Sequence, residues 1–139
     1  MDKFIAKGKL KQVNITSDMV LKELEVGKRD LEAAKQSLNN ENYKWSTIQA
    51  YYAIFHAIGS LIFAKGYREE SHVALKVAFK ELYIDTEILD DSILKTLQRG
   101  MDLREMADYK ETFSKNSAEI IIESVTNAII VIEDYIKKQ

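Results

Sequence analysis

Apolar side chains recur at alternating spacings of four and three residues along most of this sequence, and this feature constrains the fold more than any other. One such series is Val20, Leu24, Gly27, Leu31, Ala34 and Leu38. The spacing places these residues on one face of a helix. Because the chain has no proline and only five glycines, few residues would interrupt a helix. We therefore expect helices over residues 18–39, 42–65, 71–83, 90–109 and 117–137.

The short connections between these helices predict an all-α fold, namely an antiparallel up-and-down four-helix bundle with one additional short helix. The bundle domain would span residues 18–139, after an N-terminal arm over residues 1–17 that is loosely ordered or docked. The segment 42–65 carries two apolar stripes, which is typical of a helix at the centre of a bundle or buried in an oligomer. The second alternative predicts a homodimer.

The charge pattern bounds the classes of partner. The 20 basic and 22 acidic side chains are mixed along the chain and leave a net charge of −2. This gives no overall attraction to nucleic acid or to an anionic membrane, and nothing predicts sequence-specific DNA recognition. The longest apolar run, residues 50–64, is shorter than the roughly 20 residues that span a bilayer, and the N-terminus lacks the apolar core of a signal peptide. We expect a soluble cytoplasmic protein.

Cysteine is absent, which excludes disulfides, thiolate metal sites and cysteine nucleophiles. The two histidines have no carboxylates at metal-ligand spacing, so we expect neither a metal nor a cofactor. The arm contains a small lysine cluster, for which a solvated tail is favoured over phosphate contact. Its members are Lys3, Lys7, Lys9 and Lys11.

Two charged residues continue an apolar stripe in the segment 90–109. Leu94, Leu97 and Met101 are followed at the same spacing by Arg104 and Asp108. An Arg and an Asp four residues apart can reach each other on one helix face, and burying either one alone is costly. One interpretation is a partly buried ion pair that ends the helix and fixes its register. The other is a guanidinium group held by a carboxylate and offered to a phosphate.

Polar side chains also interrupt the apolar segment 42–65. Gln49 and His56 are one heptad apart and next to Tyr52, so we expect these three side chains to converge on one polar pocket. His56 is the best acid/base candidate because histidine titrates near neutral pH, although a lone histidine on an apolar face is more often a packed core residue. His72 lies in the first turn of the next helix, where a capping or surface role is favoured.

Four short segments carry a resemblance to a known family. They are AYYAIFHA at residues 50–57, KG at 65–66, SH at 71–72 and LREMADY at 103–109. Their order and spacing resemble the HEPN superfamily (higher eukaryotes and prokaryotes nucleotide-binding), specifically its small stand-alone prokaryotic branch of unassigned function. The resemblance implies an up-and-down four-helix bundle, usually a homodimer. Many members look like toxins or accessory subunits paired with a minimal nucleotidyltransferase, and the active ones are metal-independent ribonucleases.

The resemblance assigns a role to Arg104, because the ribonuclease motif of the superfamily is an arginine followed, after four to six residues, by a histidine. Arg104 matches the arginine, but no histidine follows it: Asp108 comes after three intervening residues and Tyr109 after four. Many relatives also have an arginine where this chain has Gln49. If the protein is catalytic, His56 or Tyr109 would have to move the proton while Arg104 stabilises the developing phosphate charge.

Three functions remain open from the sequence. The first is a nucleotide- or RNA-binding protein that forms a toxin–antitoxin or regulatory pair with a minimal nucleotidyltransferase. The candidate contacts to RNA or a nucleotide are Gln49, Tyr52, His56, His72 and Arg104. The second is a metal-independent ribonuclease with a nonstandard motif, whose catalytic candidates are Arg104, Asp108, Tyr109 and His56. The third is a structural dimeric adaptor in which Arg104 and Asp108 form a buried clamp.

Overall fold

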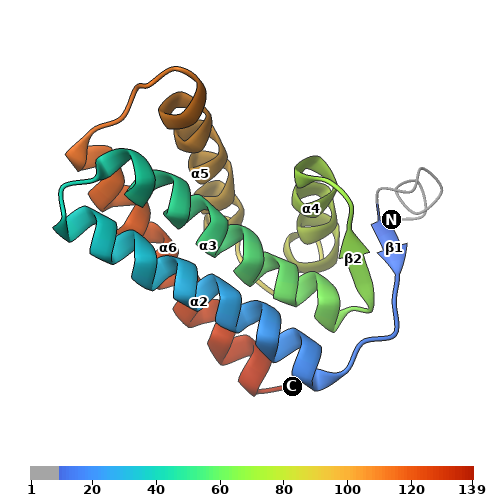
Figure 1. Cartoon of the computed structure of the whole chain (residues 1–139). Coiled ribbons are helices and arrows are strands. Elements are labelled where there is room, and N and C mark those ends of the chain that lie inside the picture. The colour runs from blue at the N-terminus through green and yellow to red at the C-terminus, as the bar shows by residue number, and fades with distance from the viewer. Residues whose placement is uncertain (1–9) are drawn as a thin grey trace.

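The structure is a computed structural model that describes residues 10–139 (Figure 1). Its helices are α2 (Ser17–Asn39), α3 (Tyr43–Ala64), α4 (His72–Phe79), α5 (Ser92–Tyr109) and α6 (Lys115–Lys137). A π-helical turn, η1 (Lys80–Ile84), continues α4, and two short strands, β1 (Leu10–Gln12) and β2 (Tyr67–Glu69), complete the fold. Four long helices and one short helix confirm the all-α bundle predicted from the sequence.

The helices begin where a side chain can bind the free backbone N–H groups of the first turn. The hydroxyl groups of Thr16, Ser71 and Ser114 accept hydrogen bonds from the third residue after them, and the Asn42 side chain does the same for α3. Gly66 follows α3 with a φ of +86°, a left-handed conformation that favours glycine. Polar caps and one glycine therefore set these helix boundaries.

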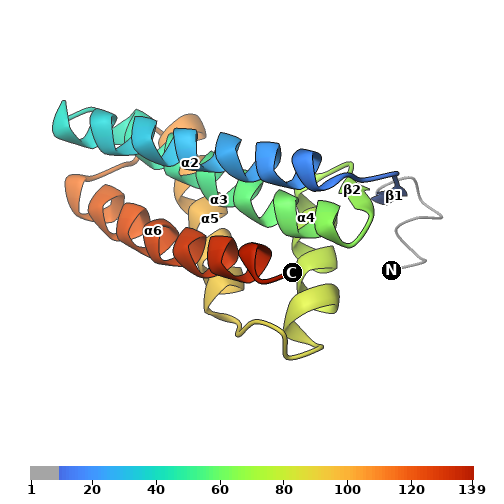
Figure 2. The ribbon, with the colours of Figure 1, turned by 90° about the horizontal axis from the view of Figure 1, so that it is seen from below.

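The centre of the bundle is α3, which packs against α2, α5 and α6. Figures 1 and 2 show α2, α3 and α6 side by side, with α4 and α5 on the side of α3 that is away from α2. The core residues Ile54, Ile58 and Leu61 are fully buried. The two apolar stripes of this segment are thus accounted for by packing within one chain, and they no longer argue for a dimer.

The apolar character of α3 also gives it the length and composition of a membrane span. Its most apolar 18-residue window has a mean hydropathy of 1.3, but 67% of that window is buried inside the protein. Core helices of soluble proteins commonly have this composition. The packing of α3 against α2, α4, α5 and α6 therefore explains its hydropathy.

The helices α2 and α3 approach each other closely at Gly27. A Cβ atom placed there would lie 2.8 Å from the carbonyl oxygen of Ala53 and 3.1 Å from the backbone nitrogen of Ala57. These are backbone atoms, which cannot move without moving α3. Gly27 thus serves as the contact point of the two helices rather than as a flexible residue.

A two-stranded antiparallel sheet, which the helical spacing did not predict, ties part of the N-terminal arm to the bundle. Leu10 pairs with Glu69 and Gln12 with Tyr67, and the Leu10 side chain is fully buried. Lys11 lies 3.6 Å from a carboxylate oxygen of Glu70. Residues 10–12 are therefore docked, whereas the predictions for Lys3, Lys7 and Lys9 lie outside the described residues.

Candidate functional site

Arg104, on α5, lies among three tyrosine rings. Its guanidinium carbon is 5.5 Å from the ring centre of Tyr109, 5.8 Å from that of Tyr52 and 5.9 Å from that of Tyr51. Its Nη2 donates a hydrogen bond of 3.3 Å to the Tyr52 hydroxyl. Tyr51 is fully buried, whereas Tyr109 is 70% exposed. These rings hold the cation between the core and the surface, since the face of an aromatic ring attracts positive charge.

The expected ion pair between Arg104 and Asp108 is not formed. None of the carboxylates in the described part of the chain makes a salt bridge with Arg104. The reason is that the guanidinium group turns toward Tyr51 and Tyr52 on α3, where it gains a hydrogen bond and ring contacts. Arg104 and Asp108 share a helix face, but the neighbouring helix decides where the arginine points.

Arg104 keeps its positive charge in this setting. Burial lowers the pKa of the guanidinium group, but the neighbouring Tyr52, Tyr109 and Asp108 raise the pKa, and the net shift is upward. Its Nε atom is buried and has no hydrogen-bond partner among residues 10–139. The site therefore offers a cation that forms no salt bridge with an acid of the described chain.

His72, at the start of α4, also contacts Tyr51. Its Nδ1 is hydrogen-bonded to the Tyr51 hydroxyl, and the two rings are stacked with centres 5.6 Å apart. The Phe55 ring lies 4.7 Å from the imidazole ring, centre to centre. Burial and then the charge of Arg104 lower the pKa of His72, which favours the neutral imidazole. Of the two histidines, His72 is therefore the one connected to Arg104.

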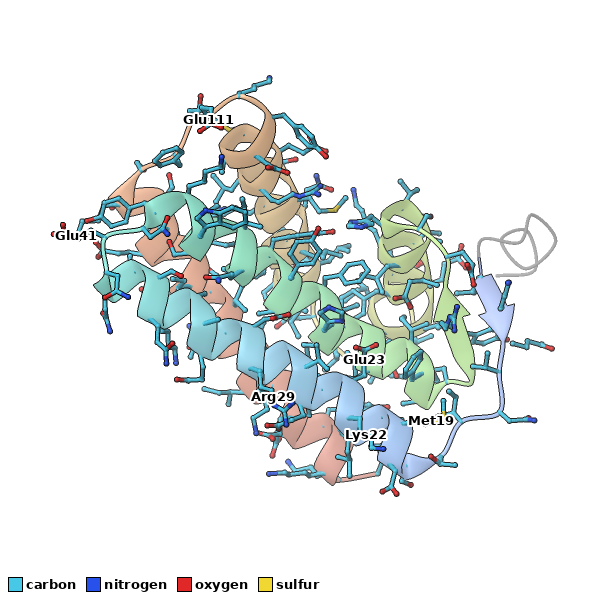
Figure 3. All side chains as sticks on the ribbon, viewed as in Figure 1. Met19, Lys22, Glu23, Arg29, Glu41 and Glu111 are labelled. Atoms are coloured by element: carbon cyan, nitrogen blue, oxygen red, sulfur yellow. The ribbon has the colours of Figure 1, made fainter. Side chains whose placement is uncertain are left out.

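His56 points to a different partner. Its Nδ1 lies 2.8 Å from Oε1 of Glu23 on α2, and its Nε2 lies 3.9 Å from Oδ2 of Asp30. Figure 3 shows Glu23 on α2, next to α3. The hydrogen bond to Glu23 raises the pKa of His56, against the effect of burial. The prediction that His56 acts as the proton donor or acceptor beside Arg104 does not fit this position, because carboxylates hold its ring toward α2.

The predicted convergence of Gln49, Tyr52 and His56 on one pocket is also wrong. With its amide nitrogen facing α2, Gln49 donates to Ser37 Oγ at 2.7 Å and to the Ala33 carbonyl at 3.1 Å. Tyr52 instead contacts Arg104 on α5. One face of α3 thus turns Gln49 and His56 toward α2, while Tyr52 lies at the edge that reaches α5. The Gln49 side chain therefore links α3 to α2.

An ion pair joins the segment after α5 to the start of α3. The side chain of Lys44, at the start of α3, lies 2.8 Å from Oε1 of Glu111. Figure 3 shows Glu111 directly after α5. The pair therefore lies close in sequence to Tyr109, the last residue of α5.

The arrangement suits an anionic ligand. Arg104 supplies charge, and the hydroxyl groups of Tyr52 and Tyr109, together with His72, can donate hydrogen bonds to phosphate oxygens. The exposed ring of Tyr109 offers a surface on which a base can stack. In the described part of the chain no three His, Asp or Glu side chains are arranged to hold a metal ion.

Sequence reasoning did not predict the contact between Tyr51 and His72. These two residues are 21 positions apart and lie on different helices, so no helical spacing relates them. Their adjacency depends on the turn at Gly66 and on β2, which bring α4 back against α3. A signal was present only in the Ser71-His72 pair, whose Ser71 caps α4 and so fixes where His72 begins the helix.

Comparison with known proteins identifies the family. A HEPN domain profile matches residues 21–138. Two proteins of Methanocaldococcus jannaschii, each named "Putative toxin", are 26% identical over 101 residues (71% of this chain, 69% of that protein) and 28% identical over 100 residues (71% and 75%). A UPF0332 protein of Thermotoga maritima is 30% identical over 81 residues, which cover 58% of this chain and 61% of that protein.

A solved structure shares the fold of this chain. The crystal structure of TT1696 from Thermus thermophilus superposes with a TM-score of 0.66 over 83% of this chain and 96% of that one, at 19% sequence identity. The HEPN profile extends over α2 to α6 and includes every residue of the Arg104 site. This chain therefore belongs to the HEPN domain family.

Proposed function

We propose that this HEPN protein binds RNA or a nucleotide through Arg104 and acts as a toxin-like component of a regulatory pair. The observation that carries the proposal is the guanidinium group of Arg104, which lies among tyrosine rings and forms no salt bridge within residues 10–139. A partly buried arginine with a purely structural role would normally be paired with a carboxylate. A ligand-binding arginine instead presents its charge to an incoming phosphate.

The surroundings of Arg104 favour a nucleotide over a simple anion. Tyr109 is 70% exposed, and aromatic rings next to a cation are the usual platform for unpaired bases. A phosphate at Arg104 and a base on Tyr109 would use both features at once. The net charge of −2 agrees with a local site rather than a broad basic surface.

The partner and the setting follow from the family and are part of the proposal. Two relatives carry toxin names, and the resemblance to HEPN proteins paired with a minimal nucleotidyltransferase supports such a partner here. We likewise propose a homodimer in the cytoplasm. Co-purification of the nucleotidyltransferase tests the partner. The mass of the purified chain at micromolar concentration tests the homodimer.

A metal-independent ribonuclease is the second candidate, and one observation favours it. Tyr51 contacts both Arg104 and a histidine, His72, and the charge of Arg104 contributes to the lowered pKa of His72. Cleavage of mixed cellular RNA in excess EDTA tests this activity, with Arg104→Ala purified identically to reveal contamination. The third function, a structural adaptor, loses its specific support because Arg104 and Asp108 do not form the expected clamp.

Binding is tested with a fluorescein-labelled single-stranded oligoribonucleotide and AMP, using wild type, Arg104→Ala and Arg99→Ala. Arg99 is an exposed arginine on the same helix and is the matched control for loss of one positive charge. We expect Arg104→Ala to weaken binding by at least about tenfold, the effect of one lost charge-assisted contact. Equal loss in both variants would indicate nonspecific attraction to charge and would contradict the proposed site.

A further inference from the structure

We propose that Tyr51 fixes His72 as a neutral imidazole that presents its Nε2–H, so that His72 and Arg104 together donate to one phosphate group. This inference rests on the proposed function, since it concerns the same ligand. It assigns Tyr51 as a positioning residue and His72 as a ligand contact. The two donors would come from α4 and α5, which lie on the same side of α3 (Figures 1 and 2).

The Tyr51 hydroxyl carries the proton of its hydrogen bond with His72. Tyr51 is fully buried, and burial strongly raises the pKa of its phenol group, so the hydroxyl stays protonated. Its hydrogen-bond partner within residues 10–139 is Nδ1 of His72. A buried hydroxyl proton without an acceptor is costly. The Tyr51 hydroxyl therefore donates, and Nδ1 of His72 accepts.

The hydrogen bond from Tyr51 also determines which nitrogen of the His72 ring carries a proton. A neutral ring carries one proton, and when Nδ1 accepts a hydrogen bond, that proton is on Nε2. Nε2 of His72 has no hydrogen-bond partner in the described part of the chain, and the side chain is half-exposed. The ring is also packed against Phe55, which limits its rotation. His72 thus holds a donor at a defined position.

Arg104 and His72 both lie beside the Tyr51 ring. The Arg104 guanidinium carbon lies 5.9 Å and the His72 ring centre 5.6 Å from the ring centre of Tyr51. Arg104 donates one long hydrogen bond, to Tyr52, and keeps further N–H groups for a ligand, while Nε2 of His72 has no acceptor within residues 10–139. A ligand that bridges them must be rich in acceptor oxygens. A phosphate group has this chemistry and carries the negative charge that Arg104 attracts. Burial and the Arg104 charge both lower the pKa of His72 in the free protein, which leaves the cation of the site at Arg104.

The state of the His72 ring is measured first by ¹⁵N NMR in the full-length protein, with His56→Gln used to assign the two histidines. We expect wild-type His72 to be the neutral form protonated at Nε2 at pH 7.5. Tyr51→Phe should shift the ring toward a mixture of the two neutral tautomers, because the donor to Nδ1 is lost. A wild-type His72 that is protonated at Nδ1, or a tautomer unaffected by Tyr51→Phe, overturns the inference whatever the protein binds.

Binding of the labelled oligoribonucleotide supplies the second readout. We expect His72→Leu to weaken binding by about tenfold and His72→Gln, whose amide nitrogen can replace Nε2–H, to restore most of it. His56→Gln is the control and should bind as wild type. Normal binding by His72→Leu, with loss in Arg104→Ala, overturns the inference and leaves the proposed function standing. No binding by wild type overturns both.

Discussion

Replacing Arg104 with alanine should cost little stability, and the structure sets the size of that cost. The side chain makes one long hydrogen bond, at 3.3 Å, and ring contacts at 5.5 to 5.9 Å, close to the outer limit for such contacts. An ordinary hydrogen bond contributes about 1 kcal/mol and a partly exposed cation–ring contact about 0.5–1 kcal/mol. Because these contributions overlap, we expect Arg104→Ala to lower the free energy of unfolding by about 1–2 kcal/mol.

A buried clamp with Asp108 would give a different result. Removing one member of a buried ion pair typically costs about 3–5 kcal/mol. Since none of the salt bridges within residues 10–139 joins the two residues, Asp108→Asn should change stability by less than about 0.5 kcal/mol. Asp108 still acts on Arg104 through its charge, so we expect a coupling energy of about 0.5 kcal/mol or less in the double variant.

The assay is urea unfolding followed by circular dichroism, with Arg99→Ala as the control for loss of an exposed arginine on α5. The midpoint and slope together give the free energy of unfolding for each variant. Losses of about 3 kcal/mol or more in both Arg104→Ala and Asp108→Asn, with a coupling energy above about 1.5 kcal/mol, would refute the reasoning. They would show that Arg104 and Asp108 are paired in solution.

Other parts of the bundle give three further predictions. Gly27→Ala should destabilise the protein by about 1–3 kcal/mol in urea unfolding, because the new Cβ would lie 2.8 Å from the Ala53 carbonyl oxygen. Gly59→Ala, whose Cβ would have its nearest neighbours at 3.7 Å, should be neutral or stabilising, and equal effects of the two substitutions would contradict this packing. The pKa of His56 is raised above its usual value of 6.5 by Glu23, so the stability from this pair is fully present below pH 6.5 and is lost as pH rises through the raised pKa. Glu23→Gln should therefore cost more stability at pH 6 than at pH 9 in chemical denaturation, and a cost independent of pH would count against the pair. Tyr83→Phe should lower the melting temperature by a few degrees, about 1 kcal/mol, because the buried Tyr83 hydroxyl donates to a main-chain carbonyl at 2.6 Å; an unchanged melting temperature would show that this bond contributes nothing.

The fold was largely predictable because helix periodicity is a local property of the sequence. The spacing of Leu24, Gly27 and Leu31 gives the buried face of α2, and the caps at Thr16 and Ser71 give helix starts. The pairing of β1 with β2 was not predictable, since it joins segments more than fifty residues apart. Nothing in a three-residue segment identifies so distant a partner.

The site was predictable only in part, for a related reason. Spacing on one helix showed that Arg104 continues an apolar stripe but could not say which neighbour it would contact. The choice between Asp108 and Tyr52 depends on the packing of α5 against α3. The partner of His56 was equally unpredictable, because it is Glu23 on the neighbouring helix α2. The sequence identified residues with the chemistry for a site, but it did not predict which residues of other helices they contact.

If Arg104 contacts a phosphate, replacing it should change the salt dependence of RNA binding. The affinity of the labelled oligoribonucleotide should be measured from about 50 to 300 mM salt for wild type, Arg104→Ala and Arg99→Ala. Loss of one phosphate contact with a single strand reduces the slope of log affinity against log salt by about 0.7. We expect this reduction, together with weaker binding, for Arg104→Ala and not for Arg99→Ala. A slope for Arg104→Ala equal to that of wild type would contradict a phosphate contact at Arg104.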